Sequence, residues 1–210
     1  MKTRLTPQLG EQGAAFLYEA LLDDTVVLCR ATTCGARLEL WATSVGWFRR
    51  RHPDLAVRRQ AGADLGARLR SAFSASFADG ADQVVIMGSD HPTLPAAYLD
   101  QAFAALGEVP LVIGPCQDGG YYLLGLRRGA WPTAAELLSG IPWSTDAVLS
   151  VTRERASGLA MPWAELPEWY DVDGPIDLAR LRRDAPADSA TARALVLLSG
   201  AAAAESGPGE

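Results

Sequence analysis

The sequence has few of the residues on which disulfide frameworks and histidine-rich metal sites depend. Its 210 residues include three cysteines and two histidines, and no two cysteines form a Cys-x-x-Cys pair. An odd number of cysteines, without such a pair and without a recognisable signal peptide, favours a protein of the reducing cytoplasm. No apolar run reaches the roughly 18 residues that a membrane-spanning helix needs. We therefore expect neither a secreted disulfide scaffold nor a transmembrane segment.

An excess of positive charge is also missing. The formal net charge is -6 at pH 7, which argues against a nucleic-acid-binding surface. Nucleotides stay compatible with this charge, because a few local cations and a metal ion can neutralise their phosphates. The composition, 49% hydrophobic and 21% charged, is that of ordinary globular proteins. We expect one domain over residues 1–200 and a flexible tail over residues 201–210, where small and polar residues gather.

Segments with strand-like and helical spacing of apolar residues alternate along the chain. The expected helices are 9–31, 45–52, 64–78, 95–106, 143–156, 175–183 and 191–198. The expected strands are 37–42, 54–58, 83–88, 110–114, 120–126 and 158–163. This alternation predicts a three-layer α/β/α sandwich with a mostly parallel sheet.

One of these strands ends in residues suited to ligand binding. The apolar run Val84–Met87 is followed by Gly88, Ser89 and Asp90. In open α/β sheets, ligands bind beyond the carboxyl ends of the strands. We expect Asp90 at such an end of a central strand, where it could hold a metal ion or a phosphate. Alternatively, Asp90 or Ser89 only caps a turn or the next helix.

Two further clusters allow both a functional and a structural interpretation. Lys2 and Arg4 bracket a hydroxyl just before a helix, where phosphate binds well, or they form a simple basic start of the chain. Asp118, Gly119 and Gly120 lie between two apolar strands and favour a hairpin turn. Their glycines would also allow a ligand to approach the backbone closely.

The last cluster offers two carboxylates. Asp171 and Asp173 lie on the same side of an extended segment, since side chains alternate there. Together with Asp90 they could supply the oxygen ligands that Mg²⁺ or Mn²⁺ prefers, and a diphosphate needs such an ion before its bond breaks. The structural alternative is that Asp173 is only the N-cap of the helix that begins at Pro175.

Taken in order, these motifs resemble those of a known family. The motifs are Lys2–Leu5, Gly62–Arg68, Gly88–Pro92, Gly114–Leu126, Ile141–Thr145 and Asp171–Leu178. They are similar to motifs of the bacterial glycosyltransferases of the arsenosugar-biosynthesis type. Those proteins have the GT-A fold of nucleotide-diphospho-sugar transferases, and the resemblance covers about residues 1–183.

The resemblance implies a nucleotide-binding role for two motifs. Lys2 and Arg4 would contact the diphosphate. Gly62, Asp64 and Gly66 would lie near the nucleoside.

It also implies a metal site and a sugar site. Asp90 and Asp173 would be ligands of Mg²⁺ or Mn²⁺, and Asp118 would be the catalytic base. The residues implied to bind the sugar or acceptor, or to close the pocket, are Gly119, Gly120, Trp143, Ser144 and Thr145.

The implied reaction is displacement of a nucleoside diphosphate from a nucleotide sugar by a hydroxyl of a small acceptor. Lys2 directly follows Met1 here, whereas family members usually begin with an apolar strand and a loop, so we expect a sheet without the usual first strand. Two alternatives stay open. The motifs also resemble guanylyltransferases that act on phosphorylated small molecules, and a protein lacking that strand could be a non-catalytic binding protein.

Overall fold

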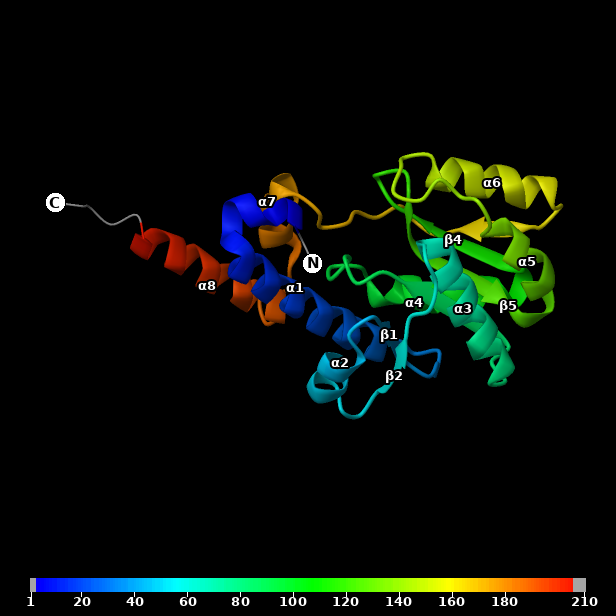
Figure 1. The fold of residues 1–210 in the computed structure, drawn as a ribbon, viewed down its shortest axis with the longest axis horizontal. Helices are drawn as coiled ribbons and strands as arrows, with labels where there is room; N and C mark the ends of the chain where they lie inside the picture. The colour runs from blue at the N-terminus through cyan, green and yellow to red at the C-terminus, as the bar shows by residue number, and fades with distance from the viewer. Residues whose placement is uncertain (1–2, 206–210) are drawn as a thin grey trace. The chain divides into compact units, whose positions relative to one another are not determined.

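The computed structural model describes residues 3–205 and divides into two compact units (Figure 1). The terminal unit combines residues 3–31, 88–95 and 170–205. The sheet unit combines residues 32–87 and 96–169. The expectation of one domain over residues 1–200 stays a prediction.

The sheet unit contains two sheets. Its strands are β1 (Glu39–Ala42), β2 (Ala56–Arg59), β3 (Gln83–Met87), β4 (Leu111–Pro115), β5 (Tyr121–Arg127) and β6 (Trp163–Glu165). Strands β1 and β2 form a parallel pair, and the others form a sheet in the order β3-β5-β4-β6. Strands β3, β4 and β6 run in one direction, and β5 is antiparallel to both of its neighbours. Three of the four strands therefore share one direction, as expected, although the reversed strand β5 makes two of the three pairings antiparallel.

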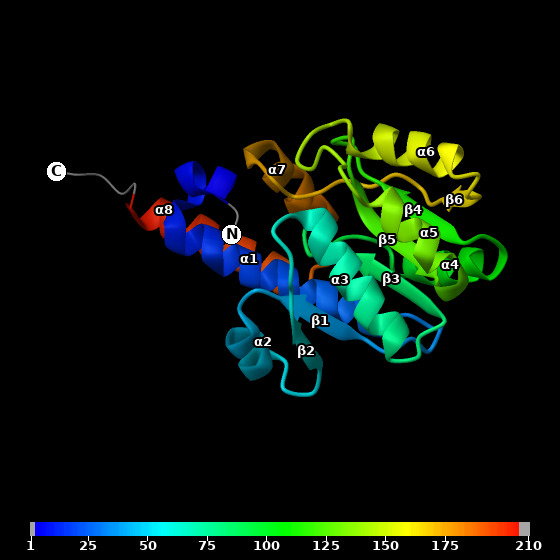
Figure 2. The same cartoon turned by 45° about the vertical axis from the view of Figure 1, so that its right-hand side comes forward.

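Helices cover both faces of the four-stranded sheet (Figure 2). The helices of this unit are α2 (Val45–Arg51), α3 (Leu65–Ala78), α4 (Ala96–Glu108), α5 (Trp131–Leu137) and α6 (Val148–Gly158). Ile113 and Leu124 face the core that α3, α5 and α6 build. On the other face, a Cβ on Gly125 of β5 would lie 3.2 Å from Leu106 of α4. The unit is thus the expected α/β/α sandwich.

The terminal unit is helical. It contains a 3-10 turn η1 (Thr3–Leu5) and helices α1 (Thr6–Arg30), α7 (Pro175–Asp184) and α8 (Ala190–Glu205). Leu17 and Leu21 of α1 are fully buried. The buried Asp24 carboxylate accepts the N–H groups of Ala190 (2.9 Å) and Thr191 (2.7 Å) at the start of α8. This carboxylate satisfies two orphan donors of α8 and complements the positive end of its dipole.

Several predicted elements are wrong in detail. The predicted helix 143–156 begins only at Val148, and α5 was not predicted at all. Residues 158–160 end α6 and turn instead of forming a strand, with Ala160 at φ 48°, and β6 follows later. The predicted helix 191–198 begins at Ala190 and continues to Glu205. Residues 206–210, the rest of the predicted flexible tail, lie outside the described residues.

The placement of β3 also differs from the prediction. Within residues 3–205, β3 pairs only with β5, because β1 pairs with β2 in a separate sheet. The strand before Asp90 is therefore an edge strand of its sheet and not a central one. None of the helices in this part of the chain is long and apolar enough to cross a membrane.

Candidate functional site

The predicted site residues fall into both units. The sheet unit holds Gly62, Asp64, Gly66, Asp118, Gly119, Gly120, Trp143, Ser144 and Thr145. The terminal unit holds Arg4, Asp90 and Asp173. Lys2 lies outside the described residues.

In the sheet unit, Asp64 and Gly62 shape the start of α3. The Asp64 carboxylate accepts the N–H of Ala67 at 2.7 Å and so is the N-cap of α3. Gly62 has φ +139°, and a Cβ there would lie 2.6 Å from the main-chain nitrogen of Arg68. Only glycine allows the loop to fold this closely onto the first turn. Both residues thus have a structural role, and their nucleotide contact stays a prediction.

Gly66 is enclosed by its neighbours. It is buried in the first turn of α3. A Cβ on Gly66 would lie 2.7 Å from the main-chain oxygen of Leu138 and 2.7 Å from Nε1 of Trp143. The space a side chain would need is therefore filled by the segment that carries Trp143.

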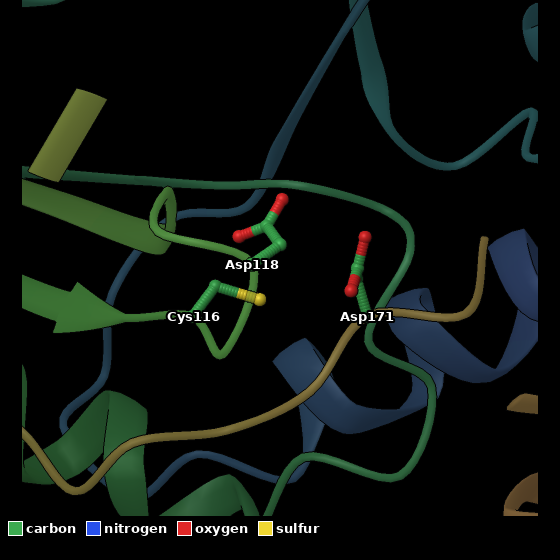
Figure 3. A group of neighbouring side chains, drawn as sticks. All are labelled: Cys116, Asp118 and Asp171. Carbon is green, nitrogen blue, oxygen red and sulfur yellow. The ribbon is translucent and has the colours of Figure 1, made fainter. Parts of the chain in front are cut away.

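Asp118, Gly119 and Gly120 form the turn of the β4–β5 hairpin, as the sequence predicted. Cys116 N–H donates to the main-chain oxygen of Gly120 (3.0 Å), and Gly119 N–H donates to that of Cys116 (3.2 Å). Oδ1 of Asp118 accepts the N–H of Gly120 at 2.8 Å. Asp118 is exposed and Cys116 is buried. Figure 3 draws both side chains on this turn, and Asp171 on the segment before α7.

A close backbone contact fixes the position of this turn. Gly119 has φ +86°, and a Cβ there would lie 2.2 Å from the main-chain oxygen of Asp146. Leu149 N–H donates to the oxygen of Gly119 at 2.8 Å. The turn is therefore held against the segment that leads into α6, and Asp118 projects from a rigid hairpin.

Residues 138–145, here called the Trp143 loop, follow directly after α5 and lead toward α6. The Trp143 ring meets Tyr121 edge-on, with ring centroids 6.3 Å apart. Ser144 has φ 66°, in the left-handed region that few residues other than glycine adopt. The Thr145 hydroxyl donates to the oxygen of Pro142 (2.7 Å), so it is already used within the loop.

The sheet unit thus brings three of the predicted motifs together. Trp143 contacts Gly66 of α3 and Tyr121 of β5, and Gly119 contacts the backbone just after the Trp143 loop. Tyr121 was not predicted as a site residue, although it directly follows the glycine turn. Burial raises the pKa of its hydroxyl above the usual range. Tyr121 therefore stays protonated and neutral at physiological pH.

In the terminal unit, the segments of Asp90 and Asp173 lie side by side. Val172 N–H donates to the main-chain oxygen of Asp90 at 3.0 Å. His91 Nδ1 lies 3.0 Å from the main-chain oxygen of Tyr170. The two predicted carboxylate segments are therefore neighbours. The described residues contain no group of three metal-ligating side chains that includes Asp90 or Asp173.

The structural alternative for Asp173 is wrong. The N-cap of α7 is Gly174, and the Asp177 carboxylate accepts the N–H groups of Asp173 (3.0 Å) and Gly174 (2.7 Å). The Asp173 carboxylate instead lies 3.4 Å from Nη1 of Arg4. The cation predicted to contact a diphosphate thus pairs with a carboxylate predicted to bind a metal ion.

The comparisons with known proteins agree with this architecture. Residues 13–145 match the family described as uncharacterized proteins conserved in bacteria (DUF2064). No curated protein matches the sequence. A candidate nucleotide-diphospho-sugar transferase from Desulfovibrio desulfuricans G20 is 30% identical, with a TM-score of 0.86 over 95% of this chain and 89% of that one.

More distant structures share the fold alone. CMP:2-keto-3-deoxy-manno-octonic acid synthetase is 10% identical, with a TM-score of 0.56 over 78% of this chain and 86% of that one. A cytidylyltransferase from Leptospira borgpetersenii is also 10% identical, with a TM-score of 0.55 over 90% and 87% of the two chains. The chain has the fold of nucleotide-sugar transferases and cytidylyltransferases, and it belongs to the DUF2064 family.

Proposed function

We propose that this protein is a glycosyltransferase that moves a sugar from a nucleotide-diphospho-sugar to a hydroxyl of a small acceptor. The observation that carries the proposal is the likeness to the candidate transferase from Desulfovibrio desulfuricans, since it extends over nearly the whole of both chains. The ordered motifs shared with glycosyltransferases of the arsenosugar-biosynthesis type support a small acceptor.

Asp118 is the proposed base. Its side chain is exposed on a rigid glycine turn, and only Oδ1 is used by the hydrogen bond to Gly120. The second oxygen can accept the proton of an acceptor hydroxyl as the oxygen attacks the anomeric carbon. The bond from that carbon to the diphosphate breaks, and the nucleoside diphosphate leaves with the electron pair.

The terminal unit would bind the diphosphate and a divalent cation. Asp90 and Asp173 lie on neighbouring segments and offer carboxylate oxygens, the ligand type that Mg²⁺ and Mn²⁺ prefer, so they would hold such an ion. A bound ion would neutralise charge on the leaving diphosphate. Arg4 now pairs with Asp173 across 3.4 Å in an exposed position. Such a weak pair can exchange for contacts with a phosphate.

The test compares two reactions of the purified protein. A panel of nucleoside-diphosphate sugars is incubated with small hydroxylated acceptors and Mg²⁺ or Mn²⁺, and release of nucleoside diphosphate is measured. In parallel, nucleoside triphosphates are incubated with sugar phosphates, and release of pyrophosphate is measured. We expect acceptor-dependent release of nucleoside diphosphate. Pyrophosphate release alone would make the protein a nucleotidyltransferase, and nucleotide binding without either product would make it a binding protein.

A further inference from the structure

Gly66 and Arg70 form one face of α3, because residues four apart in a helix lie above one another. Arg70 is half-buried, and its Nη1 donates to the main-chain oxygen of Leu138 at 2.8 Å. The same oxygen would lie only 2.7 Å from a Cβ on Gly66. Leu138, the first residue of the Trp143 loop, is therefore bound to α3 by the hydrogen bond from Arg70. Its carbonyl can lie this close to the helix because Gly66 has no side chain.

The same face of α3 also receives the Trp143 ring. A Cβ on Gly66 would lie 2.7 Å from Nε1 and 3.0 Å from Cε2 of the indole. Any side chain at this position would have to displace both the ring and the Leu138 carbonyl. Because Gly66 is buried beneath them, its environment is that of a packing contact between α3 and the Trp143 loop.

A second arginine, on α6, also bonds the loop. Arg155 of α6 donates through Nη2 to the main-chain oxygen of Gly140 at 2.9 Å. Between this anchor and the start of α6, Ser144 adopts φ 66°. A non-glycine residue persists in such a conformation only where its surroundings fix it. The contacts at Leu138, Gly140 and Trp143 supply that constraint.

We infer that Gly66 and Arg70 are positioning residues that set the Trp143 loop, and that Gly66 does not itself contact the nucleotide. The effect of the loop on substrate binding rests on the proposed function, in which Trp143, Ser144 and Thr145 are expected to close over the substrate. Arg70 has no sequence signal for this role. Arg70 and Leu138 are 68 positions apart in the sequence.

The experiment compares Arg70→Met, Arg70→Lys and Gly66→Ala with the unchanged protein. Arg70→Lys keeps a cationic donor for the Leu138 oxygen, whereas Arg70→Met keeps the length of the side chain without a donor. The matched control is Arg128→Met, which removes another guanidinium bonded to a main-chain carbonyl, that of Ala81 at 2.8 Å, at the other end of α5 from the Trp143 loop. Tryptophan emission is recorded for each protein, and Trp143→Phe identifies the part of the signal that belongs to Trp143.

We expect Arg70→Met and Gly66→Ala to alter the Trp143 emission and to raise KM for the nucleotide sugar on the order of tenfold, the scale of one lost charged hydrogen bond. Arg70→Lys should restore most of both, and Arg128→Met should change neither. Unchanged Trp143 emission in folded Arg70→Met and Gly66→Ala would overturn the inference. This emission is read in the free protein, so a failure of the proposed function, seen as no turnover of any nucleotide sugar, is distinguished from a failure of the positioning role.

Discussion

The replacement Asp118→Asn separates a catalytic from a purely structural role for the hairpin turn. In the turn, Oδ1 of Asp118 accepts the N–H of Gly120 at 2.8 Å. An asparagine keeps an oxygen at this position, so the turn hydrogen bond survives, and asparagine suits such turns as well as aspartate does. The change removes only the charge and the ability to take up a proton.

The expected effects on activity and stability differ in size. Loss of a general base lowers turnover on the order of 10²-fold or more, which corresponds to about 2.7 kcal/mol in the activation free energy. The free energy of unfolding should change by less than about 0.5 kcal/mol, because the side chain is exposed and its hydrogen bond is kept. For a chain of this length, that change moves the melting temperature by no more than about 2 °C.

The assay is release of nucleoside diphosphate from the preferred nucleotide sugar, measured together with a melting curve. Asp82→Asn is the matched control, since this carboxylate in the same unit is 91% exposed and lies away from the turn in sequence. The control should match the unchanged protein in both measurements. Full turnover in the Asp118→Asn variant would refute the assignment of Asp118 as base and leave it as a turn residue.

Three other predictions follow from the structure. Asp90→Ala should abolish any gain in nucleotide affinity on adding Mg²⁺ or Mn²⁺, measured by calorimetry with and without chelator; a gain that persists would place the ion elsewhere. Asp24→Ala should destabilise the protein by about 1–2 kcal/mol, because it uncaps α8, and a melting temperature equal to that of the unchanged protein would contradict this. Two hydrogen bonds from Arg153 hold the pKa of Glu165 below its usual range. The Arg153–Glu165 pair stabilises the fold at pH values above the pKa that Glu165 has in the unfolded chain, and this contribution is lost as the pH falls through the pKa of Glu165 in the folded protein. The difference in unfolding free energy between Arg153→Met and the unchanged protein should therefore shrink in acid unfolding curves.

Local patterns were enough to predict much of the fold. The helical spacing of apolar residues predicted α1 and α3 to within a few residues. The Asp118 turn was predicted by its glycines. These features depend on neighbours in the sequence, which is the information that a single sequence carries.

The features that sequence reasoning missed depend on distant contacts. Helix α5 is only seven residues long and begins with tryptophan and proline, so its apolar spacing is too short to recognise. The delayed start of α6 follows from the Trp143 loop, whose course is set by Gly66 and Arg70 of α3. The cap of α7 by Asp177 was missed because Asp173 offers the same residue type at a plausible position. Each of these depends on geometry that spacing alone does not reveal.

The contact between Asp24 and the start of α8 has a consequence for biosynthesis. Asp24 and Ala190 are 166 positions apart in the chain. A ribosome therefore completes the whole sheet unit before the partner of α1 exists. Until then the side of α1 that packs against α8 has no helix to cover it. Such long-range closure slows folding and leaves apolar surface exposed to aggregation, so the newly made chain should depend on chaperones more than its modest size suggests.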